Sequence, residues 1–224
     1  AFGACLASQL GAGVTVDPNL HRVATLDDAG PAARTVALSG APLLADWVVQ
    51  QRPGALLVGP DGESAQWVAQ AAARHGLEHA VCTKERHGDR SVEIQVPDLA
   101  AHRDRTPVLV DDIASSGRTL AVATHQLVGQ GLRQPECVVV HALLDEAAYA
   151  ELSGVFSRVT STDAVPHLSN RIALAPLPAD PALFSGSLAA QQAALRAMGG
   201  GVPRVLATPG AHNCRVTFTG MAPT

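Results

Sequence analysis

Short apolar runs alternate along the chain with longer segments in which apolar residues recur at helical spacing. This spacing predicts helices over residues 1–10, 42–51, 65–76, 119–131 and 146–154. Strands are predicted over 13–17, the apolar start of 55–64, two parts of 79–96, 107–112, 136–144 and 155–162. Because these strands lack the alternation of a half-exposed sheet, we expect an α/β fold, with a parallel sheet flanked by helices on both faces.

Polar residues gather where the predicted strands end. They are Asp17, Asp61, Asp111, Asp112, His141 and residues 160–163. In parallel sheets ligands bind at the carboxyl ends of the strands, so function is expected at this edge.

The two ends of the chain differ from this regular middle. The sequence opens inside a predicted helix and without an initiating methionine, which favours a fragment of a longer protein. The segment from residue 199 is rich in glycine and proline and has no clear helical or strand period. We predict an irregular tail over 185–224 and assign no function to it.

Composition narrows the classes of function. Sixteen Lys and Arg face 20 Asp and Glu, a net charge of −4, whereas nucleic-acid-binding proteins usually carry a basic excess. No apolar run approaches the roughly 18 residues of a membrane span, and no signal segment opens the chain. The four cysteines lack CxxC spacing, which favours buried thiols over a metal knuckle. We expect a cytoplasmic protein that binds neither nucleic acid nor membranes.

The stretch VLVDDIASSGRTL, residues 108–120, carries the most specific chemistry. A tight loop between a strand and a helix leaves N–H groups free at the helix N-terminus, where the helix dipole favours an anion. Ser115, Ser116 and Thr119 add hydroxyl donors, and Gly117 lets the backbone come close to a ligand. This combination suits a phosphate monoester.

Asp111 and Asp112 end the strand just before this loop. Their carboxylates repel a phosphate but suit vicinal hydroxyls, as acceptors or through a metal ion. A phosphate beside a diol describes ribose 5-phosphate. The simpler alternative is an N-capped helix, which explains one hydroxyl residue but not two aspartates followed by several small or hydroxyl residues. A GxxxxGK[ST] loop is absent, so a P-loop nucleotidase is not supported.

The same stretch resembles the phosphoribosyl-diphosphate (PRPP) binding motif of type I phosphoribosyltransferases and of ribose-phosphate diphosphokinases, the PRPP synthetases. The synthetases are resembled in order at five further landmarks: GAGVTVDPNLH, LLVGPDGES, TKERHGDR, VVVHALL and VTSTDAVPH. The resemblance implies a type I phosphoribosyltransferase-like fold. It also implies a remnant of the N-terminal synthetase domain over 1–40, a ribose-phosphate-binding domain over 41–184, and the tail over 185–224.

The activity implied by the resemblance is transfer of a diphosphoryl group from ATP to ribose 5-phosphate, giving PRPP and AMP for nucleotide biosynthesis. Lys84 and Arg86 match the loop cations that stabilise charge on the transferred group, and Asp61 matches a ligand of the cofactor Mg²⁺. The resemblance also implies a homo-oligomer. The residues that match the family's binding site for ribose 5-phosphate and PRPP are Asp111, Asp112, Ser115, Ser116, Gly117, Arg118 and Thr119.

The sequence departs from the family pattern at three places. Asn19 stands where a metal-binding or catalytic histidine is expected, and His21 is the candidate metal ligand that replaces it. Glu63 lies in the segment that resembles the pyrophosphate loop, where a negative charge is unfavourable unless a metal faces it or it turns outward. Arg118 stands where the synthetases commonly have glycine, and it either binds phosphate or faces solvent.

Three functions stay open at this point. The first is a ribose-phosphate diphosphokinase, although the family's N-terminal motifs Phe-Pro-Asp-Gly-Glu and Arg-Gln-Asp-Arg do not occur in these 224 residues. The second is a type I phosphoribosyltransferase that uses PRPP with a nucleobase. The third is a non-catalytic partner of a synthetase that binds or regulates, which the departures at Asn19 and Glu63 would allow.

Overall fold

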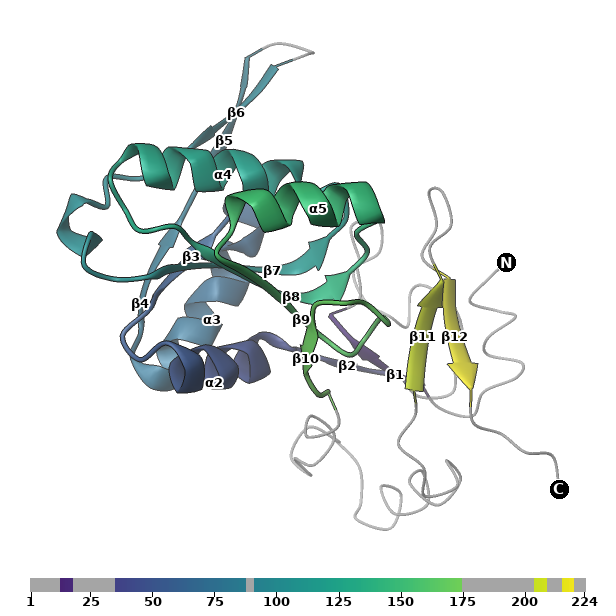
Figure 1. Ribbon diagram of the computed structural model, residues 1–224. Coiled ribbons are helices and arrows are strands. Elements are labelled where there is room, and N and C mark those ends of the chain that lie inside the picture. Colours follow the sequence, from purple (N-terminus) through teal and green to yellow (C-terminus); the bar gives the residue numbers. More distant parts are fainter. Residues whose placement is uncertain (1–12, 18–34, 88–90, 175–203, 209–214, 220–224) are drawn as a thin grey trace, which may run out of the picture. The chain divides into compact units, whose positions relative to one another are not determined.

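The structure, a computed structural model, describes residues 13–17, 35–87, 91–174, 204–208 and 215–219 (Figure 1). The chain divides into two compact units, which are described separately. The first unit comprises residues 1–40, 175–205 and 218–224, and the second comprises residues 41–174 and 206–217.

The second unit is built on a six-stranded sheet in which every neighbouring pair is parallel. In spatial order the strands are β10 (Asn170–Ile172), β9 (Arg158–Thr162), β8 (Glu136–Ala142), β7 (Pro107–Ala114), β3 (Leu56–Gly59) and β4 (Glu78–Val81). This confirms the parallel sheet predicted from the strand pattern. Strand β10 was not predicted, and β7 continues two residues beyond the predicted end at residue 112.

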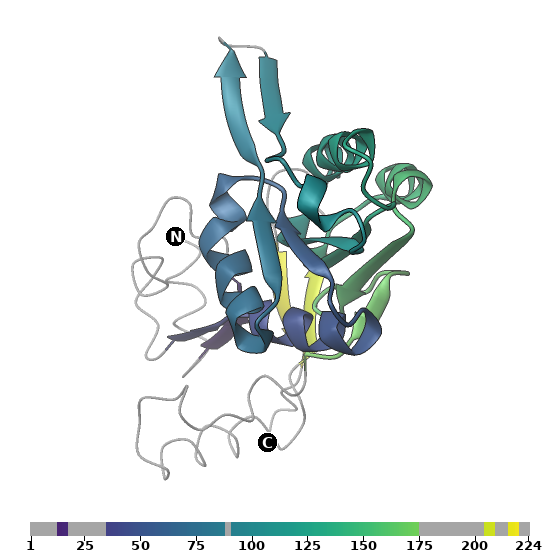
Figure 2. The ribbon, with the colours of Figure 1, turned by 90° about the vertical axis from the view of Figure 1, so that its left-hand side faces the viewer.

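Two pairs of helices cover the sheet (Figures 1 and 2). Helices α2 (Ala41–Gln51) and α3 (Ala65–His75) lie on one face, and α4 (Arg118–Gly129) and α5 (Glu146–Val155) lie on the other. The helices predicted over 42–51, 65–76, 119–131 and 146–154 therefore form, with ends that differ by a residue or two. The chain leaves β3 toward β4 and leaves β7 in the opposite direction toward β8, so the strand order reverses between β3 and β7.

The central strands are buried on both faces, which explains their apolar sequence. All four residues of β3 are buried, and so are the first four of β7, from Pro107 to Val110. Each buried Val or Leu side chain contributes about 1.5–3 kcal/mol relative to an exposed one. In β7, polar residues interrupt the pattern toward the carboxyl end of the strand, at Asp111 and Asp112.

Residues 78–95 form three strands, whereas the sequence indicated two. The first, β4, is an edge strand of the main sheet, and the chain breaks at the buried Cys82. Strands β5 (Thr83–His87) and β6 (Ser91–Gln95) then form an antiparallel hairpin that projects from the sheet (Figures 1 and 2). Buried Ile94 of β6 anchors the base of the hairpin in the main core.

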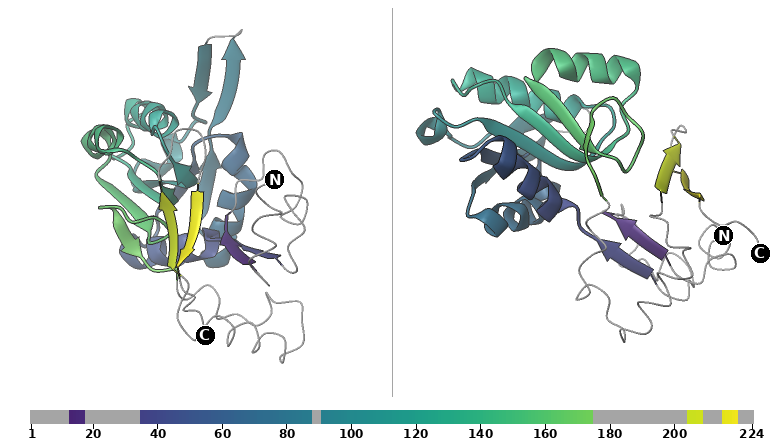
Figure 3. Two further views of the ribbon diagram at one scale, coloured as in Figure 1. Left: turned by 90° about the vertical axis from the view of Figure 1, so that its right-hand side faces the viewer. Right: turned by 60° about the horizontal axis from the view of Figure 1, so that its bottom comes forward.

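In the first unit, β1 (Gly13–Val16) pairs in parallel with β2 (Thr35–Leu38) (Figure 3). Strand β1 was predicted and β2 was not. Asp17 follows β1 with a positive φ of 39°, and its Oδ2 accepts a 2.7 Å hydrogen bond from the Gly40 N–H. The predicted helix over 1–10, Asn19 and His21 lie outside the described residues.

A further two-stranded sheet lies in the C-terminal segment for which no strand period was recognised. It consists of β11 (Arg204–Thr208) and β12 (Arg215–Thr219). Strand β11 has a short apolar run, RVLAT, and β12 has alternating apolar residues, RVTFT, and the glycine and proline around them obscure both patterns.

Candidate ribose-phosphate site

The reversal of strand order lies between the neighbouring strands β3 and β7. These two strands are hydrogen-bonded neighbours, but β3 leads to α3 on one face and β7 leads to α4 on the other. Their loops therefore part from each other, and such a point is the usual ligand site of an open parallel sheet. Residues 60–64 form one loop and residues 115–117 form the other.

The loop between β7 and α4 offers unused hydrogen-bond donors. The backbone N–H groups of residues 116–120 donate to no carbonyl or side chain of the described residues. The hydroxyls of Ser115, Ser116 and Thr119 likewise have no partner among these residues, and both serines are exposed. The N-terminus of α4 adds a favourable dipole, so this loop suits an anion.

Gly117 fixes the shape of this loop. It has a φ of 69°, in the left-handed region, and it is the N-cap residue of α4. A Cβ at this position would lie 2.8 Å from Leu152 of α5. Glycine is therefore required both for the turn and for the close packing against α5. Sequence reasoning identified Gly117 but missed Leu152, because the two residues are 35 positions apart in an otherwise ordinary helix.

Asp111 and Asp112 lie immediately before the loop, on the last part of β7. The Asp111 Oδ1 accepts a 3.1 Å hydrogen bond from the Asp112 N–H. Burial, followed by the negative charges of Asp112 and Asp61, raises the pKa of Asp111 from 3.8 to about 8. Neither Asp111 nor Asp112 forms an ion pair with any described cation. Uncompensated negative charge is therefore a property of this end of the sheet.

The loop between β3 and α3 differs because its later residues form hydrogen bonds within the loop. The Asp61 side chain accepts from the Glu63 N–H at 3.0 Å, and the Asp61 carbonyl accepts from the Ser64 hydroxyl at 2.6 Å. Gly59 lies so close to this turn that a Cβ there would meet the Ser64 Oγ at 2.3 Å. Glu63 itself is exposed.

The remaining predicted site residues are less closely gathered. Lys84 is exposed on β5, just beyond Cys82, whose N–H donates to the carbonyl of Gly59 at the start of the pyrophosphate-like loop. Arg86 occupies the position two residues further along β5, opposite Val92 of β6. Arg118 begins α4 with an exposed side chain and forms no ion pair within the described part of the chain. The hairpin thus starts at the site edge, and the roles of its cations stay predictions.

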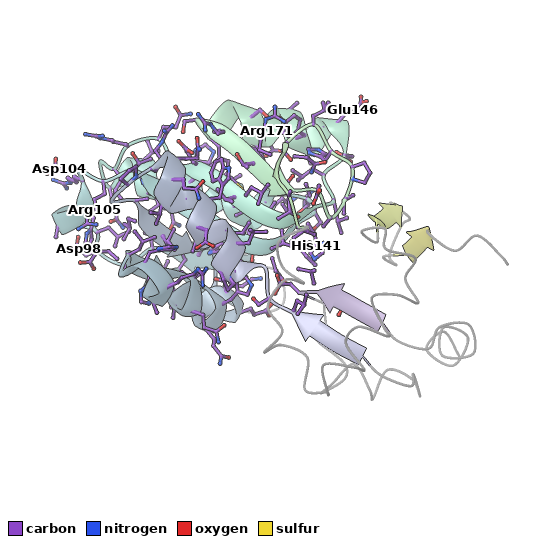
Figure 4. The ribbon with its side chains drawn as sticks, turned by 90° about the horizontal axis from the view of Figure 1, so that it is seen from below. Asp98, Asp104, Arg105, His141, Glu146 and Arg171 are labelled. Atoms are coloured by element: carbon purple, nitrogen blue, oxygen red, sulfur yellow. The ribbon has the colours of Figure 1, made fainter. Side chains whose placement is uncertain are left out.

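His141 marks the same edge of the sheet. His141 lies on β8 and is paired with Ile113 of β7. Ile113 follows Asp111 by two residues. Figure 4 shows His141 at the far end of this unit from Asp98, Asp104 and Arg105, which precede β7.

The two cysteines in the described part of the chain are free and buried, as predicted. Burial and the charge of Asp61 raise the pKa of Cys82 to about 11, and burial and the charge of Asp111 raise the pKa of Cys137. Both thiols therefore stay protonated at neutral pH and serve as small apolar side chains.

Asp61 is the described residue that best fits the predicted Mg²⁺. One of its oxygens has no partner among the described residues, and its charge contributes to the raised pKa of Asp111. Within the described ranges no three His, Cys, Asp or Glu side chains are grouped to hold a metal ion. Mg²⁺ usually keeps several waters and binds one or two carboxylates together with substrate phosphates, so Asp61 fits this mode. His21, the other predicted ligand, lies outside the described residues.

No helix among the described residues is both long and apolar enough to span a bilayer.

Comparison with known families identifies one domain in this chain. The family model "phosphoribosyl transferase domain" matches residues 43–167, more than half of the chain. A ribose-phosphate pyrophosphokinase of Methanopyrus kandleri is 31% identical over 166 residues, 73% of this chain and 55% of that protein. Ribose-phosphate pyrophosphokinase 2 of Archaeoglobus fulgidus is also 31% identical over 166 residues, 74% of this chain and 59% of that protein. The chain thus spans little more than half the length of these relatives.

A solved structure agrees with this fold. Phosphoribosylpyrophosphate synthetase from Mycobacterium smegmatis superposes with a TM-score of 0.61 at 18% identity, covering 89% of this chain and 64% of that one. This likeness supports the fold that the resemblance at the sequence level implied. The chain therefore belongs to the phosphoribosyl transferase domain family, with the type I fold and with relatives named ribose-phosphate pyrophosphokinases.

Proposed function

We propose that this chain binds ribose 5-phosphate and acts in the transfer of a diphosphoryl group from ATP to it, giving PRPP and AMP. The observation that carries the proposal is the loop between β7 and α4. Five successive N–H groups, at residues 116–120, are free beside two exposed serine hydroxyls, and the first of them follows Asp112 by four positions. The names of the related pyrophosphokinases support the same reaction.

The loop binds the 5-phosphate. Backbone N–H groups at a helix N-terminus and the Ser115, Ser116 and Thr119 hydroxyls donate to the phosphate oxygens, and Gly117 keeps the backbone accessible. Because these donors are already in place and unpaired, little reorganisation is needed when the phosphate binds.

Asp111 and Asp112 hold the ribose hydroxyls. Ionised carboxylate oxygens accept from sugar hydroxyls, and a protonated carboxyl group can also donate. The pKa of Asp111, about 8, leaves it largely protonated at neutral pH until a ligand or cation compensates its charge. The site therefore presents both a donor and acceptors to a diol.

Mg²⁺, held by Asp61 and by substrate phosphates, would supply positive charge at the transferred group. Lys84 and Arg86 lie on a hairpin that starts at the edge of the site. Residues two positions apart on a strand face the same side of it. In this proposal the two cations stabilise the charge that develops during transfer. Self-association, a cytoplasmic location and the use of ATP belong to the proposal as well.

The experiment compares the chain with a version extended by the N-terminal part of a related synthetase, each supplied with ribose 5-phosphate, Mg²⁺ and ATP. AMP that forms only when ribose 5-phosphate is present supports the proposal. Lys84→Ala is expected to lower the rate of AMP formation at least about tenfold while leaving the Kd for ribose 5-phosphate within about twofold.

Two other outcomes would reject the proposed reaction. PRPP consumption with a nucleobase would assign the chain to the phosphoribosyltransferases. Binding of ribose 5-phosphate without turnover in either version would assign it a binding or regulatory function, in which the exposed Glu63 is one of the departures from an active synthetase.

A further inference from the structure

The hairpin of β5 and β6 is joined to the rest of its unit at two places. At its start, the N–H of Cys82 donates to the carbonyl of Gly59, 2.9 Å away. At its end, the chain leaves β6 after Gln95 beside helix α4, which packs against β6 (Figure 1). The direction in which the hairpin projects therefore depends on the contacts at both places.

Gln130 makes the polar contacts at the second place. It is the C-cap residue of α4, where its N–H donates to the Gln126 carbonyl at 3.0 Å. The Oε1 of its side chain accepts from the Leu99 N–H at 3.2 Å. Its Nε2 donates to the carbonyls of Val96 and Pro97, at 3.3 and 3.1 Å. One side-chain amide thus binds three backbone groups of the segment that follows β6.

These three backbone groups have no other partner among the described residues. Pro97 has no N–H and cannot continue the strand ladder, so the hairpin pairing does not hold this segment. Apolar packing does hold it, since Ile94 and Leu99 are buried in the main core. Apolar burial is non-directional, however, whereas hydrogen bonds require a defined geometry. The core therefore keeps the segment attached, and the amide of Gln130 fixes its direction.

Helix α4 connects this contact to the candidate site. The free N–H groups of residues 116–120 lie at its N-terminus, and Gln130 ends it. A helix is a rigid element, so its two ends keep their relative positions. Strand β5, which carries Lys84 and Arg86, is paired with β6 along its whole length. The position of these two cations relative to α4 therefore follows from the way in which β6 is held.

We infer that Gln130 is a positioning residue for the proposed transfer reaction. Its side-chain amide holds the hairpin, and with it Lys84 and Arg86, in one place relative to α4 and to the loop that begins this helix. The inference rests on the proposed function, because it concerns the two cations to which that function gives a role. The side chain of Gln130 bonds to the backbone of residues 96–99, so it acts through the hairpin and not on a substrate.

The first measurement is amide hydrogen exchange of the chain with and without the substitution Gln130→Met. Methionine keeps most of the side-chain volume and removes both the donor and the acceptor of the amide. Exchange at residues 91–99 is expected to become at least about tenfold faster, because three hydrogen bonds that close this segment are lost. Exchange in β7 and β8 is expected to stay the same.

The second measurement is the rate of AMP formation, in whichever version produces AMP, the chain or its N-terminally extended form. Gln130→Met is expected to lower kcat at least about fivefold and to leave the Kd for ribose 5-phosphate within about twofold, because only the cations are misplaced. In a Lys84→Ala background the same substitution should cost a smaller factor, since the two losses then overlap.

Gln134→Met is the matched control. The Nε2 of Gln134 also donates to a backbone carbonyl, that of Val155 at the end of α5, at 3.1 Å. This variant is expected to change neither the exchange at residues 91–99 nor kcat. Gln130→Glu keeps the length of the side chain and an acceptor for the Leu99 N–H but has no donor for the two carbonyls. It should change exchange and kcat in the same direction as Gln130→Met, and it carries the test if that variant does not fold.

Four results would overturn the inference. They are unchanged exchange at residues 91–99 in the Gln130 variants, faster exchange with an unchanged kcat, a Kd for ribose 5-phosphate that rises as much as kcat falls, and an equal effect of Gln134→Met. Absence of AMP formation by the wild type in both versions would instead reject the proposed function, and with it the role of Gln130 in transfer. Hydrogen exchange requires no turnover, so it separates this outcome from a hairpin that Gln130 does not hold.

Discussion

Two acids on neighbouring strands of the same sheet, one buried and one half-buried, have different surroundings. Glu136 opens β8 at the amino end of the sheet and is 2% exposed, and its Oε1 accepts from the Arg52 Nε at 2.6 Å. Asp111 lies toward the carboxyl end of β7 and has acids, Asp112 and Asp61, as its charged neighbours. The sheet therefore neutralises one carboxylate with its own cation and leaves the other without one.

This difference separates an acid that serves the fold from an acid that serves a ligand. Arg52 follows α2, and its guanidinium is placed to compensate Glu136 whether or not anything binds. Asp111 is compensated only when a proton, a metal ion or ribose hydroxyls are present, and its pKa of about 8 reflects that need. Strongly shifted groups in a crevice are accordingly better functional candidates than paired ones.

The largest expected effect comes from breaking the paired acid. Arg52→Met removes the cation from Glu136, whose Oε2 already has no hydrogen-bond partner. We expect the free energy of unfolding to fall by roughly 3 kcal/mol, near the lower end for broken buried pairs because 39% of the Arg52 side chain is exposed. Urea unfolding measures this loss, and the Kd for ribose 5-phosphate should stay the same.

Arg105→Met is its matched control. Arg105 precedes β7 at the same end of the sheet, and its Nη1 donates to the Gly54 carbonyl without an acidic partner. Arg105→Met should change the free energy of unfolding by no more than about 0.5 kcal/mol, as for most surface substitutions. Equal losses from both variants would contradict a specific compensation of Glu136 by Arg52.

Asp111→Asn is expected to raise the free energy of unfolding, whereas Arg52→Met lowers it. Since the pKa of Asp111 rises from 3.8 in the unfolded chain to about 8 in the folded protein, the folded state holds the extra proton between these values. Stability is therefore lost as pH rises through this window, and the loss is complete above pH 8. In urea unfolding, the free energy of unfolding of the variant should exceed that of the wild type by on the order of 2 kcal/mol at pH 8.5. The difference should be much smaller at pH 4.5.

The same variant should bind ribose 5-phosphate more weakly, because an amide cannot present the charge that the sugar hydroxyls or a cation compensate. Greater stability combined with weaker binding is the signature of a functional acid. A variant that is less stable at pH 8.5 would place Asp111 with Glu136 among the structural acids.

Much of the fold could be predicted from the sequence, because strands that are buried on both faces of a parallel sheet appear as continuous apolar runs. The runs at β3, β7 and β8 and the helices between them were identified to within a few residues. Short elements were missed: β2 and β10 have four and three residues, too few for a period to be recognised. Residues 79–96 were assigned one strand too few because the break at Cys82 carries no proline or glycine.

The candidate site was predictable where function and local sequence coincide, as in the continuous run from Asp111 to Thr119. Features that depend on contacts between distant residues were not predictable. The packing of Leu152 under Gly117, the influence of Asp61 on Asp111 and the pairing of Arg52 with Glu136 all join residues at least 35 positions apart. No local pattern in the sequence specifies which of these residues meet.

Gly117→Ala sharpens the comparison by testing how rigidly the ligand-binding end is held. The new Cβ would meet Leu152 at 2.8 Å on a backbone with a φ of 69°. We expect a loss of about 2 kcal/mol in the free energy of unfolding, together with weaker phosphate binding as the loop shifts. Gly154→Ala, on the same helix as Leu152, has open space around the added Cβ and should change stability by less than about 1 kcal/mol, in the stabilising direction.

The smallest expected effect is Ser116→Ala, which removes one hydroxyl from the open loop. Since this hydroxyl has no partner among the described residues, its loss should change the free energy of unfolding by less than about 0.5 kcal/mol. A hydrogen bond to a charged group contributes about 1.5–3 kcal/mol, so the Kd for ribose 5-phosphate should rise at least about tenfold. Ser153→Ala, an exposed serine of α5, should change neither quantity. Loss of the Ser116 hydroxyl should thus leave stability unchanged and weaken ligand binding, whereas loss of the Asp111 charge should raise stability and weaken binding. An unchanged Kd for ribose 5-phosphate would show that Ser116 does not belong to the phosphate site.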